Sequence, residues 1–158
     1  MENKSYKELR VWQRGIDLVE EIYALVKLFP KEEMYTLSDQ IRRAAIPIPS
    51  NIAEGHGRHT NKDFLKFLTI SRGSLYELST QIEICSRLGY GQASRINTIK
   101  SMIEEIGKMI NSLISYRVNK EKRLSCKESL PFIPDIQSPN SHYSQPPKRA
   151  LKTKRTRR

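Results

Sequence analysis

The N-terminal part of the chain repeats apolar residues at spacings of three and four, which is the period of an amphipathic α-helix. Ser5 followed by Glu8 forms a capping-box pattern, and we expect this helix to end near Phe29 and Pro30. Two apolar stripes run along it. The stripe expected to face the core comprises Leu9, Trp12, Ile16, Val19, Tyr23 and Val26. The stripe predicted to contact another subunit comprises Val11, Leu18, Ile22 and Leu25.

A second helix is expected to begin near Thr36 and to be interrupted at Pro47 and Pro49. Each proline removes a backbone donor and crowds the turn before it, so the helix must kink, or stop and restart, at this point. Asn51 and Glu54 follow the prolines, and we predict a structural role for both, in which their side chains satisfy backbone groups freed by the kink.

Two further helices follow. Thr60 with Asp63 predicts the start of the third helix, and Gly89 predicts its end. The fourth is expected to begin near Ser94, and Met102 and Met109 on it are predicted to contact another subunit. The stripe of the third helix comprises Phe64, Phe67, Ser71, Leu75, Leu78, Ile82 and Cys85. The stripe of the fourth comprises Ile96, Ile99, Ile103, Ile106, Ile110 and Leu113.

Four amphipathic helical segments joined by short loops, without a competing strand pattern, predict an all-α fold. The arrangement that satisfies four such helices is an antiparallel up-down-up-down four-helix bundle. We expect the bundle domain to span residues 1–120 and a disordered tail rich in proline and serine to span residues 121–158.

Charge adds a prediction about partners. The chain holds 28 lysines and arginines against 17 acidic residues, a formal net charge of +11, which indicates a polyanion or an acidic protein as partner. A flexible polycation binds phosphate backbones through counterion release, so the basic residues of the tail are predicted to bind nucleic acid. They are Lys148, Arg149, Lys152, Lys154, Arg155, Arg157 and Arg158.

Two cysteines, Cys85 and Cys126, cannot supply the disulfide framework of a small secreted protein. No apolar run approaches the length of a membrane span. We therefore expect a cytoplasmic protein without a membrane partner.

Five segments between residues 5 and 118 carry a resemblance to a known family: VWQRGIDLVEEIY, FPKEE, QIRRAAIPIPSNIAEGHGR, FLKFLTISRGSLYEL and LGY. Together they resemble the 23S rRNA intervening-sequence proteins, also called the bacterial four-helix-bundle or S23 family. The most specific part is SNIAEG followed by a helix that contains GSL. Pro47 departs from the pattern, because the family usually has serine there, and we predict a looser helix at this point.

The resemblance implies an antiparallel four-helix bundle that assembles into a pentameric barrel. It also implies a relation to the accessory proteins of diversity-generating retroelements, which bind nucleic acid and a reverse transcriptase. The second apolar stripe of the first helix independently predicts a homo-oligomer, although it does not give the number of subunits.

Ten basic residues of the predicted bundle are candidates to contact nucleic acid. Those on the first helix form a ribbon, and the alternative is a solvated face neutralised by Glu8, Asp17 and Glu21. Arg42 has an alternative too, an ion pair with Glu54 inside the bundle. The candidates are Lys4, Lys7, Arg10, Arg14, Arg42, Arg43, Arg58, Lys62, Lys66 and Arg72.

Catalytic and metal-binding residues are not predicted. His56 and His59 bracket Gly57 in an expected loop without further ligands, and no carboxylate cluster could hold magnesium. No arginine lies four to six residues before any histidine, where it would support phosphodiester cleavage. The aromatic residues, expected to pack in the core rather than stack on bases, are Trp12, Tyr35, Tyr76 and Tyr90.

Residues and resemblance together predict a non-enzymatic scaffold that binds RNA or DNA, without a cofactor. It would be a homo-oligomer, a pentamer by the resemblance, with a reverse transcriptase as one candidate partner. Two alternatives remain open, an interaction module for an acidic protein and a nuclease.

Overall fold

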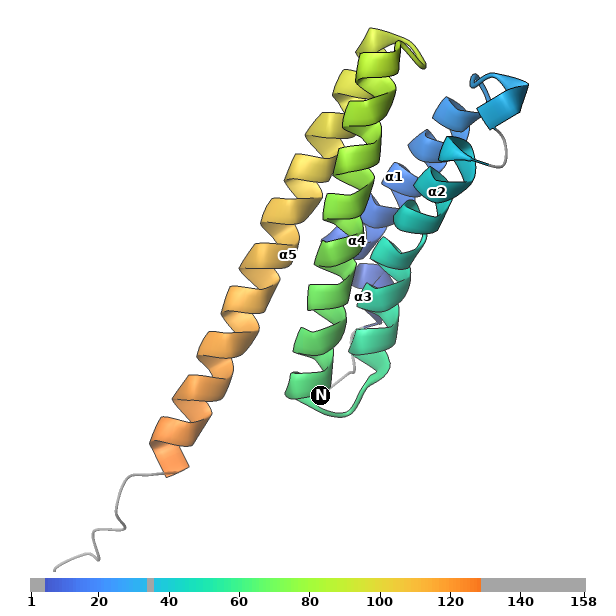
Figure 1. Cartoon of the computed structure of the whole chain (residues 1–158). Coiled ribbons are helices and arrows are strands. Elements are labelled where there is room, and N and C mark those ends of the chain that lie inside the picture. The colour runs from blue at the N-terminus through green and yellow to red at the C-terminus, as the bar shows by residue number, and fades with distance from the viewer. Residues whose placement is uncertain (1–4, 34–35, 129–158) are drawn as a thin grey trace, which may run out of the picture.

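The computed structural model describes residues 5–33 and 36–128, with side chains through residue 125. Within these residues every regular element is a helix (Figure 1). The elements are two 3₁₀ turns, η1 (Tyr6–Glu8) and η2 (Lys31–Glu33), and the helices α1 (Arg10–Val26), α2 (Leu37–Ala45), α3 (Pro47–Gly57), α4 (Asn61–Leu88) and α5 (Ala93–Glu128).

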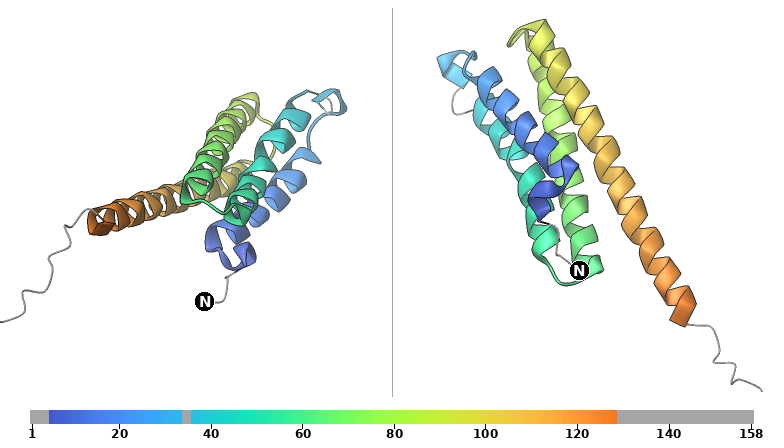
Figure 2. Two further views of the ribbon diagram at one scale, coloured as in Figure 1. Left: turned by 90° about the horizontal axis from the view of Figure 1, so that it is seen from below. Right: turned by 180° about the vertical axis from the view of Figure 1, so that it is seen from behind.

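The helices form a bundle of four rods, because α2 and α3 follow one another along a single broken rod (Figure 1). Helix α4 packs against α3 and α5, and α1 packs against α5, α2 and α3. The C-terminal part of α5 extends beyond the turn between α3 and α4 in each view (Figures 1 and 2). The predicted all-α, four-helix bundle is therefore confirmed.

The break in the second rod falls at Ile46, one residue before Pro47. Ile46 keeps helical dihedral angles, φ −57° and ψ −42°. Its N–H donates to the carbonyl of Arg42 at 3.1 Å, and its own carbonyl accepts from the N–H of Ser50 at 3.4 Å. Pro47 occupies the first position of α3, where a missing N–H costs little. The predicted stop and restart is confirmed, and the direction of the rod is kept.

Asn51 supports this break as predicted, since its Nδ2 donates to the carbonyl oxygen of Pro47 at 2.7 Å. Glu54 does not. Its carboxylate forms an ion pair with Arg58 one turn later, and half of its side chain is exposed. The predicted backbone contact of Glu54 is therefore wrong, and so is the alternative ion pair between Glu54 and Arg42.

The core contradicts the assignment of the two apolar stripes on the first helix. The stripe predicted to contact another subunit is buried within the single chain, and so is Met102. The predicted subunit contact is therefore wrong for Val11, Leu18, Ile22, Leu25 and Met102. Most of the stripe expected in the core is half-buried, and Tyr23 is exposed. The two stripes lie on adjoining faces of one helix, and spacing alone does not decide which face the other rods cover.

The boundaries of the first helix also differ from the prediction. Ser5 accepts a hydrogen bond from the Lys7 N–H at 3.3 Å and begins η1, whereas α1 itself begins at Arg10. The helix ends at Val26 rather than near Phe29. Of the predicted capping box, the structure shows the Ser5 cap alone, and it caps a 3₁₀ turn that precedes the helix.

Both ends of α4 match the prediction. Thr60 Oγ1 accepts from the Asp63 N–H at 3.0 Å, and Gly89 closes the helix in the left-handed region with φ 72°. Buried Ser71 donates its hydroxyl to the carbonyl oxygen of Ile48 at 2.9 Å, which ties α4 to α3.

Helix α5 extends into the predicted tail. It runs through Glu128, so residues 121–128, predicted to be disordered, are helical. The rest of the predicted tail, residues 129–158, lies outside the described residues. None of the described helices combines the length and the apolar character that crossing a membrane requires.

Candidate nucleic-acid interface

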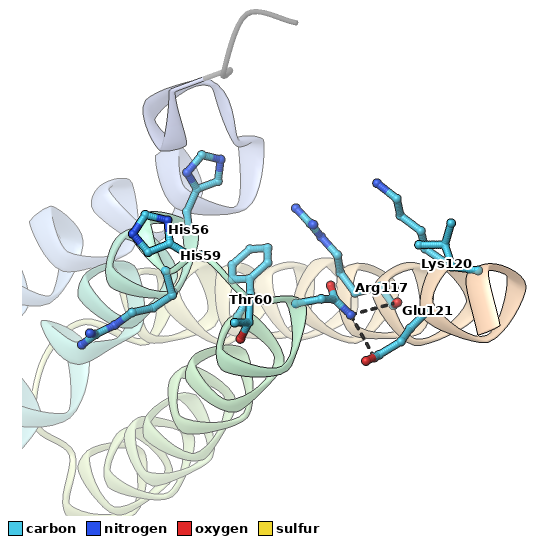
Figure 3. Close-up of a pocket in the computed structure, with 11 residues that line it drawn as sticks. His56, His59, Thr60, Arg117, Lys120 and Glu121 are labelled. Carbon is cyan, nitrogen blue, oxygen red and sulfur yellow. Dashed lines mark hydrogen bonds between the residues drawn. The ribbon is translucent and has the colours of Figure 1, made fainter. Parts of the chain in front are cut away.

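A pocket of about 490 Å³ lies between the turn that joins α3 to α4 and the C-terminal part of α5 (Figure 3). Helix α5 runs antiparallel to α4, so its last described turns lie beside the start of α4. The pocket is lined by Gly55, His56, Arg58, His59, Thr60, Asn61, Phe64, Arg117, Lys120, Glu121 and Leu124.

Arg117 is the central cation of this pocket. Its guanidinium lies over the ring of buried Phe64, 4.6 Å from the ring centroid. Lys120 follows one turn later, is exposed, and projects from the same side of α5 (Figure 3). Neither cationic group forms an ion pair with another described residue. Both are therefore available to an anion.

Hydrogen-bond acceptors line the opposite edge of the pocket. Asn61 Nδ2 donates to Glu121 Oε2 at 3.0 Å and to the Arg117 carbonyl at 3.4 Å (Figure 3). This leaves Asn61 Oδ1 buried without a hydrogen-bond partner among the described residues, and the same holds for Arg117 Nε.

Gly55 allows the close approach of α3 and α4 behind the pocket. A Cβ at this position would lie 2.7 Å from Phe67 Cβ and 2.9 Å from Phe64 Cδ2. The small residue therefore sets the position of Phe64, on which Arg117 rests.

His56 packs beside this site, with its ring edge-on to Phe64 at 6.1 Å between centroids. It belongs to the last turn of α3 rather than to a loop, so that part of the sequence prediction is wrong. His59 lies in the turn and is exposed. Residues 5–33 and 36–128 bring no group of three or more histidine, cysteine or acidic side chains together that could hold a metal ion.

Charge is distributed unequally between the two ends of the bundle. Because neighbouring rods run antiparallel, residues 5–17, 47–72 and 105–125 form one end, which we name the basic half; it contains twelve lysines and arginines and six acidic residues. The neutral half, residues 18–33, 36–46 and 73–104, contains seven and eight. The pocket lies in the basic half.

The basic ribbon predicted for the first helix is largely neutralised where it can be described. Arg14 Nη2 lies 2.6 Å from Glu105 Oε2 on α5, and Arg14 Nη1 lies 3.0 Å from Asp17 Oδ2. Arg10 also pairs with Glu105, at 3.5 Å. The Arg14 guanidinium, through its hydrogen bonds, lowers the pKa of the Glu105 carboxyl. Arg14 thus joins α1 to α5, and the alternative of a solvated, neutralised face describes this ribbon better.

The predicted arginines of α2 and α3 also have local partners. Arg42 lies over the ring of Tyr23, 5.7 Å from the centroid. Arg43 Nε lies 3.4 Å from Asp39 Oδ2. Arg58 pairs with Glu54 and lies over the Phe67 ring. Of these three, only Arg58 lines the pocket.

The remaining bundle candidates lie around the basic half. Lys7 lies on η1, and Lys62 and Lys66 lie on the exposed side of α4, none with an ion pair among the described residues. Arg72 donates to Asn111 Oδ1 at 3.1 Å. Outside the described residues lie Lys4, Lys148, Arg149, Lys152, Lys154, Arg155, Arg157 and Arg158.

Sequence reasoning missed the cations of the last described turns of α5, Arg117, Lys120, Lys122 and Arg123. A signal for them existed. No glycine or proline occurs between Gly107 and Pro131, so nothing in this stretch stops a helix at residue 120. It also missed the exposure of Tyr76, which is 60% exposed and does not pack in the core.

Comparison with known proteins places the chain. The family model described as 23S rRNA-intervening sequence protein matches residues 7–112. A crystal structure of a protein with unknown function from the S23 ribosomal protein family of Bacteroides thetaiotaomicron VPI-5482 is similar, with a TM-score of 0.62 and 26% identity over 66% of this chain and 97% of that chain. No curated protein matches. The α5 wall of the pocket lies beyond the segment matched by the family model.

Proposed function

The chain belongs to the 23S rRNA-intervening sequence protein family, and from this premise we propose that it binds RNA or DNA through its basic half, without catalysing a reaction. The observation that carries the proposal is the two-to-one excess of cations over acidic residues in that half. Nine of its twelve cations have no ion pair within the described chain, compared with three of seven in the neutral half.

Unpaired cations of this kind suit a phosphate backbone. Each contact with a phosphate releases condensed counterions, so several weak contacts add up to an affinity that falls steeply with salt. The chain also leaves α5 at this end, and its last eleven residues contain seven basic ones. Backbone contacts carry no sequence information, so we expect little sequence preference from them.

We propose binding without catalysis, in which the histidines have no catalytic role. His56 is held edge-on between the rings of Tyr6 and Phe64, which suits packing better than proton transfer. Incubation of labelled RNA with pure protein is expected to leave the RNA intact. Defined cleavage that disappears in His59→Ala would contradict this part.

The proposal also includes self-association, in which the chain binds a second copy of itself. A groove of about 440 Å³ between α1 and α5 presents Leu9, Met109 and Leu113 at the surface. Met109 therefore remains a candidate for the subunit contact after Met102 is assigned to the core. Sedimentation velocity of wild type and Met109→Glu tests this, and a monomer at micromolar concentration would refute it. A pentamer and a reverse transcriptase partner remain predictions from the resemblance.

The test of binding is a fluorescence-anisotropy titration of structured RNA, single-stranded DNA and duplex DNA over a salt series with the full chain. We expect sub-micromolar binding that weakens steeply as salt increases. Absence of binding to all three at low salt would refute the proposal. An acidic protein captured by the chain after nuclease treatment would then favour the interaction-module alternative.

A further inference from the structure

We propose that the pocket beside Arg117 holds one unstacked nucleotide of the bound strand. This inference rests on the proposed function and adds recognition of a base and a sugar to a surface that otherwise meets phosphates. The pocket volume of about 490 Å³ lies within the range of small-molecule sites, about 300 to 1,000 Å³.

The base has a platform in Arg117. The guanidinium carbon lies over the Phe64 ring, 4.6 Å from the ring centroid, so the ring supports the guanidinium from one side. The guanidinium makes no hydrogen bond to another described residue, and Arg117 lines the pocket. Proteins that bind single strands stack unpaired bases on aromatic rings and on arginine planes. A base on the second face of Arg117 would continue the stack that Phe64 begins.

The mixture of polar groups favours a nucleotide over a bare phosphate. The Glu121 carboxylate, which lines the pocket, is an acceptor, and a phosphate brings only further acceptors and negative charge. Sugar hydroxyls and the amino groups of bases donate hydrogen bonds, so they suit this edge. Lys120, on the Arg117 side of the pocket, is then free for the phosphate of the same nucleotide (Figure 3).

One of the two walls of the pocket lies outside the segment that the family model matches. Arg117, Lys120 and Glu121 all follow residue 112, where that match ends. The partner wall, from Gly55 to Phe64, lies inside it. The C-terminal part of α5 therefore supplies the second wall of the pocket, beside the turn that lies within the matched segment.

The experiment compares two probes of equal length and charge with the full chain, a labelled ten-residue oligoadenylate and an abasic oligomer. Wild type is expected to bind the oligoadenylate about fivefold or more tightly than the abasic oligomer, the size of one stacked base. Arg117→Lys keeps the charge and removes the plane, so it should lose this preference and bind the abasic oligomer as wild type does. Arg87→Lys, the same change on an exposed arginine of the neutral half outside the pocket lining, should alter neither affinity.

The outcomes separate the two proposals. If wild type binds neither oligomer, the proposed function fails. If wild type binds both equally, or Arg117→Lys weakens both equally, the nucleotide site is refuted while the phosphate-binding function stands. The wild-type comparison needs no variant, so it decides the matter even if Arg117→Lys unfolds. Saturation-transfer NMR with AMP should show contact with the base protons, and displacement of AMP by millimolar inorganic phosphate alone would argue for a simple phosphate site.

Discussion

The two halves of the bundle are built from the same four rods, but they differ in how many of their cations form ion pairs. In the neutral half, Glu83 on α4 pairs with Lys100 on α5 at 2.7 Å and with Arg87 at 2.8 Å, and Arg95 pairs with Glu21 on α1 at 3.6 Å. The Glu83–Lys100 and Arg95–Glu21 pairs join different helices. In the basic half, Arg14 and Glu105 also join α1 to α5, but the last described turns of α5 carry cations without such partners.

A carboxyl group in each half has a pKa lowered by its ion pairs. The pKa of Glu83 is lowered to about 2, chiefly by its hydrogen bond with Lys100 and next by that with Arg87. The pKa of Glu105, at the border of the two halves, is lowered by Arg14. The comparison therefore teaches that a high net charge need not be spread over a protein, because internal pairing can confine the free part of it to one end.

Reversing charge in each half tests most directly whether the location of the cations governs RNA binding. Lys120→Glu with Arg123→Glu is expected to weaken RNA binding by about tenfold or more, because phosphate contacts are lost and repulsion is added. Lys27→Glu with Lys31→Glu makes the same change in net charge on exposed residues of the neutral half. Anisotropy at fixed salt measures both. Equal losses in the two pairs would mean that net charge, and not its location, governs binding.

Removing the close approach at Gly55 should disturb the basic half through its packing. Gly55→Ala places a Cβ within 3 Å of Phe67 and Phe64, so α3 and α4 must shift, and we expect a loss of about 1 to 3 kcal/mol in the free energy of unfolding. Gly57→Ala is the matched control, because the Cβ it adds would meet no atom of another part of the fold within 4 Å. Urea denaturation gives both values, and equal stability of the two variants would contradict this account of the turn.

Acid should act on the neutral half through Glu83. A carboxyl whose pKa is lowered from 4.5 to about 2 on folding stabilises the protein above pH 4.5 and loses that contribution as pH falls towards 2. Glu83→Gln should therefore be less stable than wild type at pH 7, and the difference should shrink between pH 4.5 and 2. Thermal melts across this range measure it, with exposed Glu20→Gln as control. A difference that does not change with pH would exclude the ion pair as its cause.

The smallest effect is expected at the border between the halves. Arg14 is occupied by Glu105 and Asp17, so Arg14→Gln should change RNA affinity less than Lys62→Gln, which removes an unpaired cation from the same half. Parallel salt titrations compare them, with a lower slope expected only for Lys62→Gln. The reverse order would restore the basic ribbon of the first helix as a binding surface.

The elements with local signals could be predicted from the sequence. Thr60 and Asp63 cap α4, Gly89 ends it, and the two prolines interrupt the second rod, because each depends on residues within one turn of each other. The choice between the two apolar stripes of α1 could not be predicted. It depends on which face α2, α3 and α5 cover, which is a property of the assembled bundle and not of the helix alone.

The candidate site was less predictable, for a similar reason. The predicted cations Arg10, Arg14 and Arg43 have partners in the fold, and the pairing of Arg14 with Glu105 joins residues 91 positions apart. Arg117 becomes part of a pocket only because the fold places α5 beside Phe64. Spacing on one helix finds a ribbon of charge, whereas the availability of that charge depends on contacts between helices.

Mapping of RNA contacts by ultraviolet crosslinking and mass spectrometry tests the central claim most directly. The full chain would be crosslinked to a labelled structured RNA at low and moderate salt and then digested. The account predicts crosslinked peptides from the turn between α3 and α4 and from residues 113–125. Crosslinks confined to the neutral half, or to residues 129–158 alone, would contradict it.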